Sequence, residues 1–263
     1  MKMYFYNHPY HLVSISPWPL LTSLSLFIMM IGSLKLFNYS MLLLFILGFY
    51  MVIMCSLQWW RDILRESTFQ GLHNMKIYKM LSLGMVLFII SELLFFISLF
   101  WAYFHSALSP NIEIGNIWPP KNILQFNPYE IPFLNTVILM SSGFSITWSH
   151  HSMLFNNKLK SSIGMLITIS LGVSFSLIQV YEYNQSSFCM SDSIYGSMFF
   201  MTTGFHGFHV IIGGIFLLIM FIRMLYSQFS SYHHFGFEAA AWYWHFVDTI
   251  WIIVFTMIYW WNY

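Results

Sequence analysis

The sequence predicts an all-α integral membrane protein with seven transmembrane helices. Of its 263 residues, 58% are hydrophobic and only 7% are charged, and the mean hydropathy is +0.67. Soluble globular domains carry about 25% charged residues, so this composition cannot cover a surface that faces water. Seven apolar stretches reach about 20 residues, the length that an α-helix needs to cross the hydrocarbon core. Residues 1–263 are therefore expected to form a single transmembrane domain.

The first three apolar stretches span about 17–36, 41–60 and 78–105. Lys35 interrupts the first stretch near its end, where a lysine stem can lie in the hydrocarbon while its ammonium group reaches the headgroups. The third stretch carries a carboxylate, Glu92, near its middle. All three stretches are predicted to cross the membrane.

A long, proline-rich polar connection follows the third stretch, and proline lacks the backbone N–H that a helix interior needs. The remaining spans are predicted at about 132–151, 161–183, 193–225 and 238–261. The last one ends in Tyr259-Trp260-Trp261, and such aromatic residues anchor a helix at the membrane interface.

Small residues predict a packing face on the sixth span. Gly196, Thr203, Gly207 and Gly214 are spaced by 7, 4 and 7 residues, which brings them to one side of a helix. Small side chains allow a neighbouring helix to approach closely. We therefore expect this face to pack against another helix of the bundle.

Lysine and arginine residues fall unevenly on the two sides of the membrane. With seven spans, two of the ten, Lys35 and Lys121, lie on one side and eight on the other. Since basic residues orient membrane proteins, this split supports the seven-span count and places the N-terminus on the basic side. The eight are Lys2, Arg61, Arg65, Lys76, Lys79, Lys158, Lys160 and Arg223.

Charge and cysteine content exclude several classes of protein. A net charge of +1 provides no basic field that could hold nucleic acid. The two cysteines, Cys55 and Cys189, are too few for a Cys-rich zinc or iron–sulfur site.

The sequence shows no internal repeat of the kind that builds many transporters. It also shows no basic region before the first span, so no cleavable targeting segment is expected. The 19 methionines lead to the hypothesis of synthesis inside an organelle.

The histidines are not spaced as redox ligands. Two haems held across a bilayer need histidine pairs about 13 residues apart within a span, at 1.5 Å of rise per residue. No span offers such a pair, and His206 and His209 are only three residues apart. A dinuclear thiolate copper site needs two neighbouring cysteines, which the chain lacks. We therefore expect no catalytic residue, no metal ligand and no cofactor of its own in this chain.

Glu92 is the most informative carboxylate. An ionised group near the middle of a span costs at least about 2.5–3.5 kcal/mol on insertion scales, so such residues are candidates for function. Glu92 could equally be a protonated acid that is hydrogen-bonded to a neighbouring helix, or a polar contact with a partner subunit.

The seventh span carries a possible polar ladder. Glu238, Trp242 and His245 are related by i, i+4 and i+7 and share one face, and Asp248 lies one turn beyond His245. Such a ladder could relay protons or could form a buried polar network that fixes the helix register. We favour the network, because the sequence indicates neither an entry nor an exit for protons.

A candidate lipid site lies at the basic interface between the second and third spans. Trp59 and Trp60 mark the headgroup level. Arg65, the hydroxyl groups of Ser67 and Thr68, and nearby His73 offer several donors to a phosphate. A bound phospholipid headgroup is one interpretation, and arginines that simply extend to the interface are the other.

Several segments closely resemble subunit 3 of the mitochondrial cytochrome c oxidases, and the resemblance covers nearly the whole chain. The most specific is the run from His233 to Asp248. The other matching segments are His8–Val13 with Ser16–Pro19, Trp59–Asp62, Arg65–Gly71, Ser91-Glu92, Phe100–Ser106, Trp118–Pro120, Thr147-Trp148 with His150–Ser152, and Gly204–Gly207.

The resemblance implies two groups of helices, two and five, around a V-shaped cleft that holds phospholipids. It implies a mitochondrial inner membrane location with the N-terminus in the matrix. The complex of that family, respiratory complex IV, passes electrons from cytochrome c to oxygen and pumps protons. Haem and copper belong to subunits 1 and 2. Subunit 3 is expected to contact these and accessory subunits, to stabilise subunit 1, to support proton uptake and to help shape an oxygen route through the cleft.

The resemblance also assigns individual residues. Glu92 occupies the position of the buried carboxylate that faces subunit 1. Leu72 stands where the family often has a histidine, so the family's headgroup contacts do not carry over in full to this chain. The positions of lipid contact are Arg65, Ser67, Thr68, Phe69, His73 and Arg223. The alternative interpretation is an autonomous proton-coupled carrier that uses Glu92 together with Glu238, His245 and Asp248.

Overall fold

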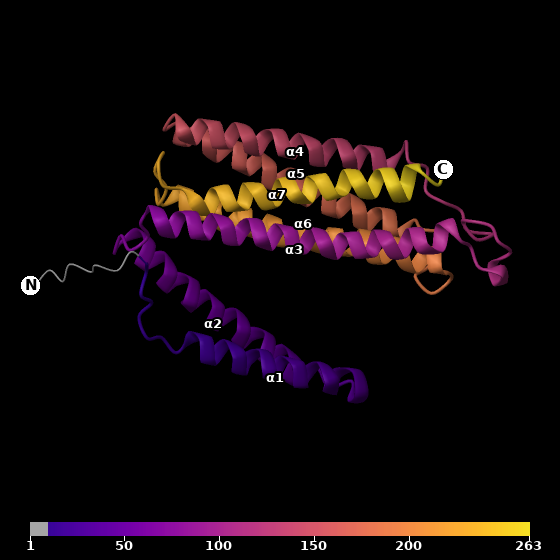
Figure 1. Ribbon diagram of the computed structural model, residues 1–263, viewed down its shortest axis with the longest axis horizontal. Helices are drawn as coiled ribbons and strands as arrows, with labels where there is room; N and C mark the ends of the chain where they lie inside the picture. The colour runs from indigo at the N-terminus through magenta and orange to yellow at the C-terminus, as the bar shows by residue number, and fades with distance from the viewer. Residues whose placement is uncertain (1–9) are drawn as a thin grey trace, which may run out of the picture. The chain divides into compact units, whose positions relative to one another are not determined.

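A computed structural model describes residues 10–263, and these residues contain helices and connections but no strand. Lys2, His8 and Pro9, which entered the sequence arguments, lie outside the described residues. Seven helices in the described range are long and apolar enough to cross a membrane. They are α1 (Trp18–Tyr39), α2 (Leu43–Thr68), α3 (Met75–Leu108), α4 (Ile131–Leu154), α5 (Lys158–Asn184), α6 (Ile194–Leu225) and α7 (Phe235–Val254), which continues as a π-helical segment, η2 (Phe255–Trp260) (Figure 1).

The all-α, seven-span prediction is confirmed, and the helices differ from the predicted spans mainly at their ends. The largest difference is in α2, which was predicted to end at 60 and continues to Thr68. The prediction counted apolar residues, whereas a helix continues through polar turns at the headgroup level as long as its backbone bonds are made. Side-chain caps mark other ends: Asn157 accepts a bond from Lys160 N, and Ser193 accepts one from Gly196 N.

The chain divides into two compact units, residues 1–81 and 82–263. In the first unit, α1 packs directly on α2 at two glycines. A Cβ atom on Gly32 would lie 2.5 Å from the backbone nitrogen of Phe45, and one on Gly48 would lie 2.6 Å from the Cα atom of Met29. Since helices in lipid associate through close backbone packing, these glycines hold the α1–α2 pair together.

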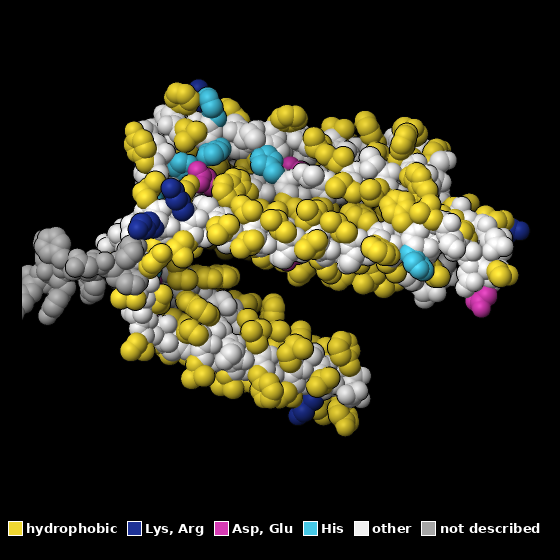
Figure 2. Space-filling model, in the orientation of Figure 1, with side chains coloured by type: hydrophobic (Ala, Val, Ile, Leu, Met, Phe, Trp, Pro, Cys, Tyr) yellow, Lys and Arg dark blue, Asp and Glu magenta, His cyan; other side chains and the backbone are white. Residues whose placement is uncertain are grey.

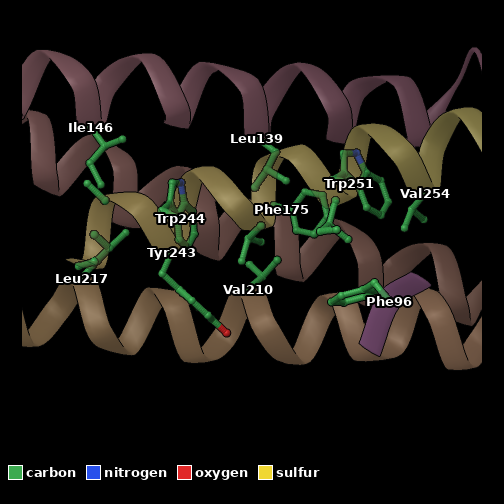
Figure 3. Close-up of a cluster of buried hydrophobic side chains, with 14 of the residues drawn as sticks. Phe96, Leu139, Ile146, Phe175, Val210, Leu217, Tyr243, Trp244, Trp251 and Val254 are labelled. Atoms are coloured by element: carbon green, nitrogen blue, oxygen red, sulfur yellow. The ribbon is translucent and has the colours of Figure 1, made fainter. Parts of the chain in front are cut away.

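Helix α7 forms the core of the second unit. More than half of its apolar span is buried, compared with a third or less for each of the other six spans. It contacts both α4 and α6, and α5 packs against α4 and α6 in turn. Trp244 and Trp251 of α7 are fully buried and point into the space between these helices (Figure 3).

The two tryptophans join α7 to its neighbours by packing and by hydrogen bonds. Trp244 Nε1 donates to Ser142 Oγ on α4 over 2.9 Å, and its ring lies over Gly172 of α5 and Gly213 of α6. Trp251 Nε1 donates to Thr136 Oγ1 on α4 over 3.0 Å. Each indole therefore uses its apolar face for packing and its N–H group for a bond to another helix.

The predicted packing face of α6 is only partly correct. Thr203 is buried and accepts a hydrogen bond from Tyr183 of α5, as expected for a helix contact. Gly196 is buried too, but it lies against Cys189 in the connection before α6 and not against a helix. A Cβ atom on Gly207 or Gly214 would meet no atom within 4 Å among the described residues. The close approach is made by Gly213 instead, because Trp244 comes from a helix that the spacing on α6 could not specify.

Replacement of Gly172 by alanine should destabilise the second unit. The new Cβ atom would lie 2.6 Å from Cη2 of Trp244, and this buried indole is held by its bond to Ser142. Overpacking of this kind costs about 1–3 kcal/mol. Gly204→Ala on α6 is the control, since its Cβ atom would meet nothing within 4 Å. Thermal denaturation in detergent should rank Gly172→Ala below both the parent and the control, and equal midpoints would contradict this packing.

Candidate functional site

A hydrogen-bonded Glu–His pair lies at mid-membrane depth in the second unit. Glu92 is 17 residues after the start of α3 and 16 before its end, and His209 lies 15 residues after the start of α6 and 16 before its end. Glu92 Oε2 is 2.9 Å from His209 Nε2. The sequence left open whether Glu92 is hydrogen-bonded to a neighbouring helix. In the structure it is, and the helix is α6.

The geometry fixes the number of protons on this pair. His209 Nδ1 lies 2.7 Å from the carbonyl oxygen of Phe205, which can only accept, so the Nδ1–H group donates to it. A hydrogen bond between Nε2 and Oε2 then needs one shared proton. That proton makes either a carboxylic acid beside a neutral imidazole or an imidazolium beside a carboxylate. Both forms are neutral as a pair, which avoids an uncompensated charge in the hydrocarbon.

Aromatic rings surround the His209 side chain. The ring centroids of Phe96, Phe95 and Tyr243 lie 5.0, 6.4 and 6.4 Å from that of the imidazole. The imidazole side chain is only 9% exposed, whereas the Glu92 side chain keeps 27% of its surface open. The histidine is therefore enclosed, whereas the Glu92 side chain is partly exposed.

His206, the other histidine of α6, does not join this pair. It is fully buried, and its Nε2–H group donates to the backbone carbonyl of Val247 on α7 over 3.2 Å. That bond directs the ring toward α7 and Trp251, whose ring centroid is 4.9 Å away. The i, i+3 histidines therefore serve different neighbours, and Glu92 contacts only His209 of the two.

The predicted ladder on α7 is divided in the structure. His245 Nδ1 is 3.9 Å from Asp248 Oδ2, and Asp248 is buried against Gly143 of α4. Glu238 lies two turns before His245 on α7, and its Oε1 atom is 3.3 Å from Nε2 of His234. The three residues thus belong to two separate polar clusters, because Glu238 faces the residue one turn before it.

A further buried pair was not anticipated from the sequence. Tyr259 donates its hydroxyl proton to Glu182 Oε1 over 2.7 Å, and both side chains are buried. Glu182 lies near the end of α5. From the sequence alone, a carboxylate at this position would be placed at the membrane interface. The only signal in the sequence was a glutamate within an otherwise apolar span, and its partner is 77 residues away.

Among the predicted lipid contacts of the first unit, Arg65 lines an open groove of about 310 Å³, together with Trp18 and Trp59. The Arg65 side chain is 57% exposed and lies 3.8 Å from Asp62. Asp62 and Glu66 also line the groove, and both already accept hydrogen bonds: Asp62 from Trp18 Nε1 at the start of α1, and Glu66 from Ser14 Oγ in the segment before it.

The other predicted lipid contacts differ in what they can offer. The hydroxyl groups of Ser67 and Thr68 both donate to the carbonyl of Leu64, so neither proton is free for a phosphate. Phe69 is 86% exposed, and the ring of His73 lies 5.5 Å from that of His11. Of the donors proposed from the sequence, Arg65 is the one that lines the groove.

Arg223 belongs to the second unit, near the end of α6. Its Nε donates to Gln228 over 3.1 Å, and the guanidinium group lies 4.5 Å above the ring of Phe229. These contacts hold the arginine at the end of the bundle where Lys158 and Lys160 begin α5.

Comparison with known proteins identifies the family. The family model described as Cytochrome c oxidase subunit III matches residues 8–263, a range that includes all seven helices. The chain belongs to the cytochrome c oxidase subunit III family. It is 52% identical over 256 residues to cytochrome c oxidase subunit 3 of Drosophila melanogaster, which covers 97% of this chain and 98% of the relative. It is 53% identical to that of Canis lupus familiaris, with the same coverage. For Rhipicephalus sanguineus the identity is 54% over 254 residues, or 97% of this chain and 99% of the relative.

Membership of the cytochrome c oxidase subunit III family confirms the resemblance found in the sequence and makes this chain a subunit of that complex. All seven helices, including the Glu92–His209 pair and the divided clusters of α7, lie within the matched residues.

A Glu92→Gln substitution should leave assembly and the haem spectrum of the complex intact. The amide can donate to His209 Nε2 as the shared proton does, and it carries no charge. Glu92→Leu is the matched comparison, since it leaves the buried Nε2 atom without a partner, which costs about 1–3 kcal/mol. The amount of assembled complex should therefore fall for Glu92→Leu and not for Glu92→Gln. Loss of assembly with Glu92→Gln would mean that the charge itself is structural.

Proposed function

We propose that this chain is a membrane-integral, redox-inactive core subunit of cytochrome c oxidase, respiratory complex IV. The complex oxidises cytochrome c, reduces oxygen to water and pumps protons, and its haem and copper centres belong to partner subunits 1 and 2. This chain stabilises subunit 1, supports proton uptake and holds phospholipid in its cleft. The observation that carries the proposal is the neutral Glu92–His209 pair, in which the Glu92 side chain remains partly exposed.

The open side of Glu92 supports a contact with a partner subunit. A polar group at the middle of a span is expensive wherever lipid covers it, and such groups face protein or a water-filled cavity instead. Since 27% of the Glu92 side chain stays exposed beside His209, a partner's protein surface would complete its cover. We assign that surface to subunit 1, and accessory subunits extend the assembly.

The bonds of the α6 histidines support the redox-inactive role. A haem or copper ligand needs a ring nitrogen that is free to coordinate. Both nitrogens of His209 are used, one by Phe205 and one by Glu92. His206 Nε2–H is bonded to Val247, and its remaining nitrogen, Nδ1, is enclosed in the buried core beside Trp251 and Phe175. The residues of α6 that attracted a redox interpretation thus act in helix–helix contacts.

Proton uptake is supported indirectly in this proposal. The Glu92–His209 pair holds one proton inside an aromatic enclosure, and the carboxylates of α7 form separate clusters rather than a chain. The division of the ladder weakens the alternative of an autonomous proton-coupled carrier. The chain then helps proton uptake by maintaining the structure of subunit 1.

The location follows from the spans and their charges. We propose a multi-pass protein of the mitochondrial inner membrane with its N-terminus on the matrix side. In the second unit, Lys158, Lys160 and Arg223 lie at one end of the helices, and Lys121 lies in the connection at the other end. This arrangement agrees with basic residues that mark the matrix side.

The function is tested by a reduced-minus-oxidised spectrum of the detergent-purified complex, recorded before and after this chain is split away. All haem absorbance should remain with the other subunits, because this chain supplies no axial ligand. Haem absorbance that travels with the separated chain would overturn the redox-inactive assignment.

An Arg65→Ala substitution should lower the phospholipid that co-purifies with the complex. Arg65 is an exposed guanidinium group in the groove and can bind a phosphate with two parallel bonds. Lys35→Ala, at the other end of α1, is the control for the loss of one positive charge. Phosphorus content per haem should fall for Arg65→Ala alone, and an unchanged content would rule out the headgroup assignment.

A further inference from the structure

Three potential metal ligands from two helices meet at one end of the second unit. His150 lies near the end of α4, His234 is the residue that caps the start of α7, and Glu238 follows one turn later. One ligand atom from each residue lies within 4.8 Å of the other two. Figure 2 shows histidine side chains gathered beside an acidic side chain at this end of the bundle.

The spacing of the ligand atoms fits a small tetrahedral ion. His150 Nε2 is 3.2 Å from His234 Nε2, and His234 Nε2 is 3.3 Å from Glu238 Oε1. Zinc binds imidazole nitrogen and carboxylate oxygen at about 2.0–2.2 Å, so two of its ligands in a tetrahedron lie about 3.3–3.6 Å apart. Two of the three edges of the cluster therefore already have nearly the length that zinc requires.

The backbone orients His234 as a ligand. Its Nδ1–H group donates to the carbonyl oxygen of Ser230 over 3.0 Å, so Nε2 of the neutral ring carries a lone pair. That lone pair faces the Glu238 carboxylate and the Nε2 atom of His150. Atoms at these distances need a proton or a metal ion between them: His150 Nε2–H can donate to the lone pair of His234, and a bound metal ion would take the place of that proton. A ring whose second nitrogen is bonded to a backbone carbonyl is also the usual arrangement of a metal-bound histidine.

We propose that His150, His234 and Glu238 bind one zinc ion, with the fourth position taken by water. Two imidazoles and one carboxylate form a ligand set that zinc prefers. The ion joins the end of α4 to the start of α7. Zinc has no redox chemistry here, so the site adds no electron-transfer centre to the chain.

The surroundings make the site both rigid and accessible. The His234 side chain is 5% exposed, and the buried ring of Phe237 lies 5.5 Å from that of His150. The Glu238 side chain keeps 18% of its surface open, so an ion can enter from the end of the bundle. The expectation that the chain holds no metal came from spacings within single spans. His150 and His234 are 84 residues apart, and only the fold brings them together.

Zinc binding to the purified oxidase complex, measured by equilibrium dialysis with radioactive zinc, tests the site. His150→Gln and Glu238→Gln should each remove one equivalent of zinc per complex, or weaken its binding at least about tenfold. His151→Gln is the matched control, because this neighbouring histidine contacts Phe155 instead. Equal zinc uptake by the parent and both ligand variants would overturn the proposal, as would an equal loss in the control.

A second measurement does not depend on how the variants fold. Anomalous diffraction at the zinc edge, from crystals of the parent complex equilibrated with zinc, should show a peak about 2.0–2.2 Å from one atom of each of the three residues. No peak at this position at saturating zinc would mean that a proton, and not a metal ion, lies between the ligands, and the proposal would be wrong.

Discussion

The hydrocarbon core contains no water, so a polar side chain placed there is stabilised by a partner within the protein. In the second unit several of these partners lie on another helix. Glu92 of α3 bonds to His209 of α6, Trp244 of α7 bonds to Ser142 of α4, and the π-helical end of α7 bonds through Tyr259 to α5. Because apolar side chains gain little from leaving lipid, these bonds and close packing select which helices become neighbours.

Helix α7 connects this constraint to function. The indole of Trp244 fills the space over Gly172 and Gly213, which sets the distance between α5, α6 and α7. The same helix carries Tyr243 beside His209, so the packing that holds the bundle also encloses the Glu–His pair. This chain thus presents the partly exposed Glu92 side chain, held in a pair that is neutral as a whole, as a proposed contact surface for its partner.

The amount that could be predicted depended on whether the signal was local in sequence. Seven apolar stretches are local, so the helices were predicted to within a few residues at most ends. Pairing across helices is not local. Glu92 and His209 are 117 residues apart, and the assignment of Gly214 instead of Gly213 to the packing face shows that one position on a helix changes its neighbour. On α7, His245 and Asp248 lie close together, whereas the partners of Glu238 include His234 beside the end of α4, which the spacing on one helix could not indicate.

A double-mutant cycle on Glu92 and His209 tests the central claim, that a neutral polar pair couples α3 to α6. Unfolding free energies of the complex would be measured in detergent for Glu92→Leu, His209→Leu and the double variant. Interhelical hydrogen bonds in membrane proteins average about 0.6 kcal/mol and reach about 1.7 kcal/mol. We predict a coupling energy within that range, with the double variant less destabilised than the sum of the single ones. Strict additivity of the two substitutions would contradict the account.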